Sequence, residues 1–186
     1  MNRLFVPEFR TALTDQENRM SGHASVFGAL AQIGSHWERI HQRAFNGALG
    51  RDDVRFLLNH NPDNLLGRTS SGTLELQTDE TGLQVRSLLP DTTLGRDVRE
   101  LVRRGDLTGM SFGFKPTAHE WGRAPDGRQL RTITALELYD VSLATYPAYK
   151  ESNDVVLRTR DFRNIPQIGD RRSQIIRARS RLLTER

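Results

Sequence analysis

Short apolar segments separated by closely spaced turn residues are the feature of this sequence that most restricts its fold. Several segments alternate apolar and polar residues at a period of two, which indicates strands with one buried face. Because the turns between them are short, neighbouring strands are expected to run antiparallel. The strands predicted in this way are 20–28, 54–59, 65–68, 72–76, 83–89, 110–115 and 130–143, the last as one long strand or two.

Residues 93–104 carry the clearest helical pattern. Apolar side chains recur at i, i+4, i+7 and i+8 from Leu94, which predicts one buried face. A polar residue among 91–93 can cap the start of this helix, and Gly105 can end it in the left-handed conformation. A helical spacing over 36–50, interrupted by Asn46-Gly47, predicts a short helix or helical turn there as well.

About seven strands and one or two helices indicate an α+β fold. We expect a small, mostly antiparallel β-barrel or curled sheet with the helices packed outside it. A length of 186 residues suits one domain with an appendage, and no unit of twenty to fifty residues repeats, which excludes solenoids and propellers. We place the domain at 1–157 and a tail, partly disordered or a short amphipathic helix, at 158–186.

The composition narrows the chemistry and the cellular compartment. The chain has no cysteine, which excludes disulfides, thiolate zinc sites and a cysteine nucleophile. It also lacks a long apolar run and the basic-then-apolar start of a signal peptide, so we expect a soluble protein made in the cytoplasm. With 36% hydrophobic and 27% charged residues, the chain can bury a core of its own.

Positive charge is concentrated at the C-terminal end. The tail 158–186 contains nine arginines and three acidic residues, a net charge of +6, whereas the whole chain has +4 and residues 1–157 therefore carry −2. Such a tail could bind nucleic acid or an acidic protein surface through a salt-sensitive attraction. A solvated extension without a specific function is an equally good interpretation of the charge alone.

The stretch 104–114 holds the best candidate for a nucleophile. Met110, Phe112 and Phe114 alternate with Ser111 and Gly113 as in a strand, so Ser111 is expected to point away from the apolar face. Glycines on either side leave the backbone beside the hydroxyl bare, so that another chain could lie close to it. Serines on polar strand faces are common, however, and a nucleophile needs a base and an orienting group.

His60 and Asp140 are the candidates for these two roles. His60 ends an apolar segment just before Pro62, where we expect a turn, and strand ends deliver side chains to functional sites. Asp140 interrupts an apolar run in which an unpaired charge would be costly, with Glu137 as the second choice. No metal site is predicted, because His36 and His41 diverge on a helix and His119 has no companion ligands.

Several sequence blocks follow one another in a fixed order: 21–28, 58–60, 66–69 with 71–74, 104–106 with 109–114, and 140–142 with 146–149. Together these blocks resemble the prohead protease family of tailed bacteriophages over residues 20–153. The family is related to the herpesvirus capsid maturation protease, a barrel surrounded by helices with a Ser-His site. Two positions depart from the family pattern: Asn61 stands where Asp is frequent, and His23 where an aromatic residue is frequent.

The resemblance implies a serine endopeptidase with Ser111 as nucleophile and His60 as general base. The third member is an acidic residue in the phage motif, here Asp140, whereas the herpesvirus relatives use a second histidine. No cofactor is implied, and the loop 146–150 is a candidate source of oxyanion donors. The implied partners are the scaffold protein, the scaffold-like N-terminal segment of the major capsid protein and the protease itself, inside a prohead assembling in the bacterial cytoplasm.

Two other classes remain open from the sequence. A non-enzymatic assembly or nucleic-acid-binding protein would use the domain as a scaffold and the basic tail as its working part. An inactive or domesticated relative, retained in a host genome, would keep the fold without the activity. The presence of both Ser111 and His60 argues against such decay.

Overall fold

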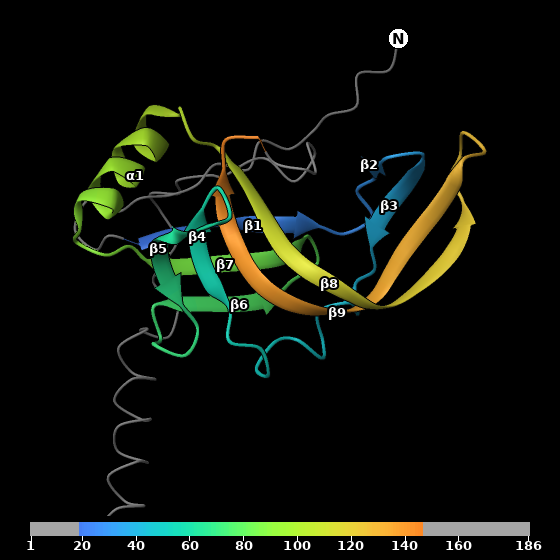
Figure 1. The fold of residues 1–186 in the computed structure, drawn as a ribbon, viewed down its shortest axis with the longest axis horizontal. Coiled ribbons are helices and arrows are strands. Elements are labelled where there is room, and N and C mark those ends of the chain that lie inside the picture. Colours follow the sequence, from blue (N-terminus) through green and yellow to red (C-terminus); the bar gives the residue numbers. More distant parts are fainter. Residues whose placement is uncertain (1–18, 147–186) are drawn as a thin grey trace, which may run out of the picture.

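The computed structural model describes residues 19–146, which form nine strands and one helix (Figure 1). The tail at 158–186 and the loop residues 147–150 lie outside this range, so the predictions made for them are not addressed by the structure. In chain order the elements are β1 (Arg19–Val26), β2 (Ala31–Ile33), β3 (His36–Ile40), β4 (Arg55–Leu58), β5 (Asn61–Arg68), β6 (Leu74–Thr78), β7 (Gly82–Leu88), α1 (Thr93–Arg104), β8 (Gly109–Arg123) and β9 (Gln129–Ala144).

The strands form two sheets. One has three antiparallel strands in the order β1-β7-β6, and the other has six, in the order β2-β3-β9-β4-β5 with β8 paired to β9. The strand β9 is paired along one edge with β3 and then β4, both parallel to it, and β8 runs antiparallel along its other edge. The fold is thus mostly β and mostly antiparallel, as predicted, but it is two open sheets with one helix and the expected closed barrel is not observed.

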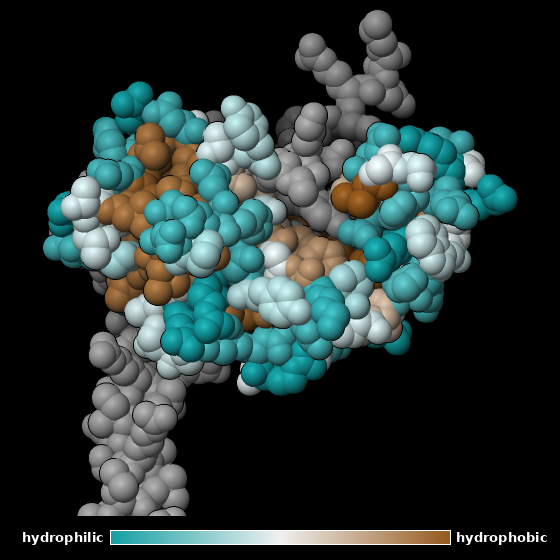
Figure 2. Space-filling view, viewed as in Figure 1, coloured by the Kyte–Doolittle hydropathy of each residue, from teal (hydrophilic) through white to brown (hydrophobic). Residues whose placement is uncertain are grey.

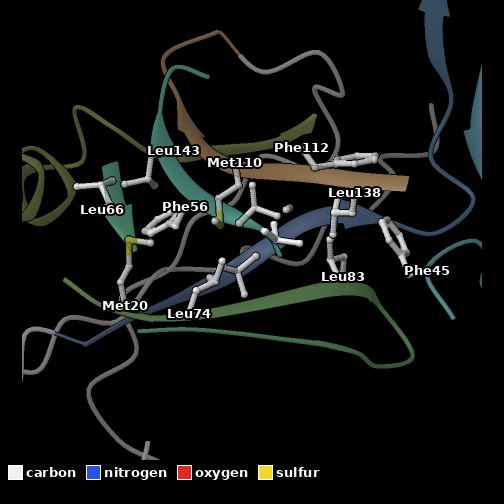
Figure 3. Packing of buried hydrophobic residues seen from close by; sticks show 14 of the residues in the cluster. Met20, Phe45, Phe56, Leu66, Leu74, Leu83, Met110, Phe112, Leu138 and Leu143 are labelled. Carbon is white, nitrogen blue, oxygen red and sulfur yellow. The ribbon is translucent and has the colours of Figure 1, made fainter. Parts of the chain in front are cut away.

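The core lies between the two sheets. In Figure 3, Met20, Leu74 and Leu83 extend from the three-stranded sheet toward residues of the larger one, among them Phe56, Met110 and Leu138. All six side chains are at most 2% exposed. At roughly 2 kcal/mol for each large apolar side chain removed from water, this cluster is a main source of stability, and it holds β4, β8 and β9 at fixed positions.

The helix agrees with the sequence prediction in its bounds and in both caps. The Thr92 side chain accepts a hydrogen bond from the backbone N–H of Gly95, and Gly105 ends the helix with a φ of 78°. Val98 and Val102 are buried, as the periodicity requires. Within 19–146, no helix combines the length and apolar character needed to cross a membrane. The helix leads directly into β8.

The helix predicted over 36–50 is wrong at 36–40, whereas the alternative prediction of helical turns agrees with residues 42–50, where the Leu49 N–H donates to the Phe45 carbonyl. Residues 36–40 form β3, which pairs with β2 through the two-residue turn Gly34-Ser35 and with β9 in parallel register. Gly34 has a φ of 58°, a conformation that glycine adopts without strain. Residues 42–50 are turns. The contacts of β3 with β9 are distant in sequence, so the local helical spacing could not reveal them.

The β8-β9 hairpin is longer than the sequence indicated. Its strands have 15 and 16 residues, and the predicted polar turn at 125–127 is its tip, with Gly127 at a φ of 85°. The stretch 130–143, predicted as one strand or two, is a single strand. Figure 1 shows this hairpin curving away from the three-stranded sheet toward its tip.

Part of the molecular surface is apolar. Figure 2 shows an apolar area over the end of the molecule that carries α1 and β5. Leu65, Leu88 and Leu101 are all more than a third exposed, and the first two line a groove together with Pro90. The residues that line this groove do not include Ser111, His60 or Asp140.

Candidate active site

Ser111 is the third residue of β8 and lies on the face away from the core. Its neighbours Met110 and Phe112 are buried in the core cluster, so the alternation of the strand turns Ser111 to the other side. There it pairs directly with Ser142 of β9. Ser111 is 6% exposed, which places its hydroxyl in a largely water-excluded setting.

His60 lies in a tight turn between β4 and β5. Leu58 and Asn61 close the hairpin as a register pair, which leaves Asn59 and His60 as a two-residue loop. Both loop residues have a φ of 56°, as hairpin turns of type I′ require. The expectation that Pro62 forms the turn is wrong, because Pro62 is inside β5. Outside glycine, Asn and His are among the residues that best tolerate this left-handed conformation.

Three hydrogen bonds fasten this turn to the end of β9. The Asn59 backbone N–H donates to the Leu143 carbonyl at 2.7 Å, and the Asn59 side-chain oxygen accepts from the Thr145 N–H at 2.8 Å. The His60 N–H donates to the Ser142 hydroxyl at 3.1 Å. Figure 1 shows the β4-β5 turn beside this end of β9. Surrounding contacts of this kind can hold residues in sparsely populated conformations at functional sites.

The His60 imidazole is paired with Asp140. Its Nδ1 lies 2.6 Å from the Asp140 carboxylate, and the side chains are 39% and 15% exposed. The hydrogen bond to Asp140 raises the pKa of His60 above its ordinary value of 6.5, against the opposing effect of burial. A neutral imidazole that donates from Nδ1 keeps a lone pair on Nε2, so Nε2 is the nitrogen that can accept a proton.

Asp140 reaches His60 because of two features of the β8-β9 pair. Gly113 is directly opposite Asp140, and a Cβ placed on it would lie 2.1 Å from the Asp140 Oδ2. Only glycine leaves room for the carboxylate in this arrangement. The register also shifts here, with Tyr139 as an extra residue in β9. This bulge places Leu138 in the core opposite Phe114, although Leu138 is only two residues before Asp140 in the strand.

Glu137, the second choice for the acid, is elsewhere. It pairs in register with Lys115, and its carboxylate accepts a hydrogen bond from the Tyr139 hydroxyl at 3.0 Å. The structure therefore places Asp140, and not Glu137, against His60.

Ser111 and His60 both lie beside Ser142 of β9. Among the residues described, the Ser111 hydroxyl is not hydrogen-bonded to the imidazole. Ser142 connects the two, since it is the register partner of Ser111 and accepts the His60 N–H. Directly opposed residues in antiparallel strands have Cα atoms about 5 Å apart. Ser111, His60 and Asp140 thus gather around one end of β9, from three different strands or turns.

The other histidines have different partners from His60. His23 pairs with Asp79 at 2.8 Å, and the rings of His36 and His119 both contact Trp121 edge-on. Within the part of the chain that the structure describes, no three His, Asp or Glu side chains are placed to hold a metal ion.

Sequence reasoning did not assign a role to Asn59 or Ser142. Both are polar residues in buried or strained positions, and Ser142 is fully buried. The available signal was the spacing Asp-x-Ser in β9, which puts Ser142 on the same face as Asp140. Gly113 was expected to bare the backbone for another chain, whereas here it makes space for Asp140.

This arrangement of a serine and a histidine-carboxylate pair on a β scaffold defines a candidate serine hydrolase site. The model of the caudovirus prohead serine protease family matches residues 7–167, so the chain belongs to that family. The prohead protease of Enterobacteria phage HK97 is 31% identical over 144 residues. The matched region is 75% of this chain and 60% of that relative, so the chain spans less than two thirds of the relative's length.

Proposed function

We propose that this chain is a serine endopeptidase of phage head maturation. The single observation that carries the proposal is the 2.6 Å contact between His60 Nδ1 and Asp140, in a turn fastened beside the strand of Ser111. Membership of the prohead serine protease family supports the same chemistry.

The reaction follows from the roles that these groups can take. His60 Nε2 accepts the proton of the Ser111 hydroxyl as Oγ attacks the carbonyl carbon of the substrate peptide. Asp140 keeps the imidazole in the tautomer with hydrogen on Nδ1 and stabilises the imidazolium. The same proton then passes to the leaving amine, which gives an acyl-enzyme. Water, deprotonated by His60, releases the acid and restores Ser111.

The contact between Ser111 and His60 forms during this cycle. Catalytic hydrogen bonds frequently tighten only when substrate is bound. Ser111 is the register partner of Ser142, and the His60 N–H donates to the hydroxyl of the same serine, so we expect side-chain rotation to bring Oγ toward Nε2. We expect that binding of a substrate peptide over Ser111 drives this rotation.

The proposed substrates are proteins of the assembling phage head. These are the scaffold protein, or the scaffold-like N-terminal segment of the major capsid protein, and this chain itself. The description of the family and the name of the HK97 relative support a place inside the prohead, in the bacterial host. Confinement raises the effective concentration of enzyme and substrate, so a slow protease suffices.

The proposal is tested by coexpression of the full chain with the capsid and scaffold proteins of the same phage or prophage. Mass spectrometry of the products should show defined cleavage with the wild type and none with Ser111→Ala or His60→Ala. The exposed residues Ser35 and His41 provide matched controls, since Ser35→Ala and His41→Ala should leave cleavage unchanged. Cleavage that survives Ser111→Ala would refute the proposal.

The basic tail at 158–186 is proposed as a docking signal for scaffold or capsid protein, removed later by self-cleavage. Its net charge of +6 on an otherwise slightly acidic chain motivates this role. Deletion of the tail should lower incorporation into proheads, and unchanged incorporation would refute the role.

A salt titration of DNA binding separates the protease proposal from the alternative, in which the chain works only as a nucleic-acid-binding assembly protein. Strong, salt-sensitive DNA binding by both the wild type and Ser111→Ala would favour that alternative, provided that the wild type does not cleave coexpressed capsid or scaffold protein.

A further inference from the structure

Ser142 has an unusual position for a serine in a central strand. It is fully buried, and its hydroxyl both accepts and donates a hydrogen bond within the candidate site. It accepts the backbone N–H of His60 at 3.1 Å and donates to Asp140 Oδ1 at 2.8 Å. A hydroxyl can satisfy such a pair of partners because it is a donor and an acceptor at once.

These contacts close a ring of hydrogen bonds. Asp140 Oδ1 accepts hydrogen bonds from the Ser142 hydroxyl and from His60 Nδ1. The Ser142 hydroxyl in turn accepts a hydrogen bond from the backbone N–H of His60. The backbone and the side chain of His60 are therefore held at two points by one connected pair of residues. This matters because His60 has a φ of 56°, a conformation that the chain adopts only when other contacts enforce it.

We propose that Ser142 is a positioning residue of the active site, which fixes the His60 turn and aims the Asp140 carboxylate at the imidazole. This inference rests on the proposed function, since it assigns Ser142 a part in the Ser111 reaction. Ser142 touches neither the scissile bond nor the proton that is transferred. It acts through His60 and Asp140, and it does so from the position directly opposite Ser111.

Loss of the hydroxyl has two expected effects. The His60 N–H loses its acceptor, so the turn opens more frequently and its amide hydrogen exchanges faster. The Asp140 carboxylate loses a donor that shares its negative charge, so it binds the imidazolium form of His60 more strongly. The acid limb of the pH-rate profile then shifts to higher pH. The cleavage rate falls about tenfold to a hundredfold, as expected when a buried hydroxyl that serves two partners is lost.

The test compares Ser142→Thr with Ser142→Val in the full chain. These side chains have the same shape, so any crowding by the added methyl group is shared and the difference isolates the hydroxyl. Ser142→Ala, which is smaller than serine, serves if both larger residues prevent folding. Cleavage of coexpressed capsid protein is followed with Ser111 intact. Amide exchange and the NMR titration of His60 are measured in a Ser111→Ala background, which prevents self-cleavage.

The inference predicts that Ser142→Thr retains the rate and the His60 amide protection that Ser142→Val or Ser142→Ala loses. Equal rates and equal protection with and without the hydroxyl, in folded protein, would overturn it. This result is distinct from failure of the proposed function. If His60→Ala and Ser111→Ala still cleave, the protease proposal fails. If they are inactive but Ser142→Ala is fully active, only the role of Ser142 fails.

Discussion

Two aspartates of β9 and its hairpin turn show how position decides what a carboxylate can do. Asp126, at the exposed tip of the β8-β9 hairpin, accepts hydrogen bonds from Trp37 Nε1 and Arg128 Nε, both at 2.7 Å. These partners lower the pKa of Asp126 to about 2. Asp140, at the other end of β9, has a histidine and a buried serine as partners.

The difference between the two lies in the partners and in the burial. Arg128 is permanently charged, so the Asp126 pair is a static ion pair, and surface pairs of this kind contribute little to stability. His60 changes its charge near neutral pH, and Asp140 is 15% exposed, so their contact can take part in proton transfer. The same hairpin therefore has a structural end and a candidate catalytic end.

The largest effect is expected from Asp140→Asn. The substitution keeps the size of the side chain but removes the charge that holds the His60 tautomer, and in serine hydrolases this change lowers the rate by about 10⁴. Asp126→Asn should leave the rate unchanged. Both rates are measured by capsid-protein cleavage, with circular dichroism to verify folding. Equal activity of the two variants would remove the distinction between the two ends.

A smaller but still large effect is expected from Gly113→Ala. The new Cβ would lie 2.1 Å from the Asp140 carboxylate and must displace it, and a shift of about 1 Å in a catalytic group can cost about a hundredfold in rate. Gly122→Ala is the matched control on the same strand, since a Cβ there meets nothing within 4 Å. Wild-type activity of Gly113→Ala would contradict the placement of Asp140.

The pH dependence follows from the raised pKa of His60. Only the neutral imidazole can accept the Ser111 proton, so the cleavage rate should rise with pH through a midpoint above about 6.5. Asp140→Asn removes the hydrogen bond that raises the pKa, so the NMR titration midpoint of His60 should move down. The stabilising effect of this pair is full below the unfolded-state pKa and disappears as pH rises through the folded-state pKa. A midpoint that does not respond to Asp140→Asn would contradict the pairing.

The smallest effect concerns stability. Asn59→Ala loses the hydrogen bond to Thr145 and places alanine at a φ of 56°, so we expect a loss of about 1–3 kcal/mol in unfolding free energy. Asn59→Gly tolerates this φ and should lose less. Asn46→Ala, in an exposed loop, should change little. The three are compared by urea denaturation, and equal midpoints would show that the turn is not held as described.

The elements that the sequence could predict are those formed by local interactions. The helix 93–104 and the strand 83–89 were predicted because caps, turns and periodicity are local. The parallel pairing of β3 and β4 with β9 joins residues that are 93 and 85 positions apart, and no local pattern encodes it. The pairing of β3 replaced helical structure at 36–40, and the bulge at Tyr139 likewise arises from the pairing of β8 with β9.

The candidate site was predicted only in part for the same reason. Ser111, His60 and Asp140 were identified mainly through blocks that resemble a known family. The supporting contacts of Ser142, Asn59 and Gly113 depend on which strands lie side by side. A serine two residues after an acid is unremarkable until β4 brings the His60 turn against it.

The central claim is that Ser111 is a nucleophile activated by His60. Its most direct test is labelling of the folded chain with a fluorophosphonate, in which the serine oxygen bonds to phosphorus and fluoride leaves. Mass spectrometry should find one adduct, on Ser111, which is absent in His60→Ala and present in His41→Ala. An unlabelled Ser111 in protein that cleaves its capsid partner, or labelling that is independent of His60, would contradict the account.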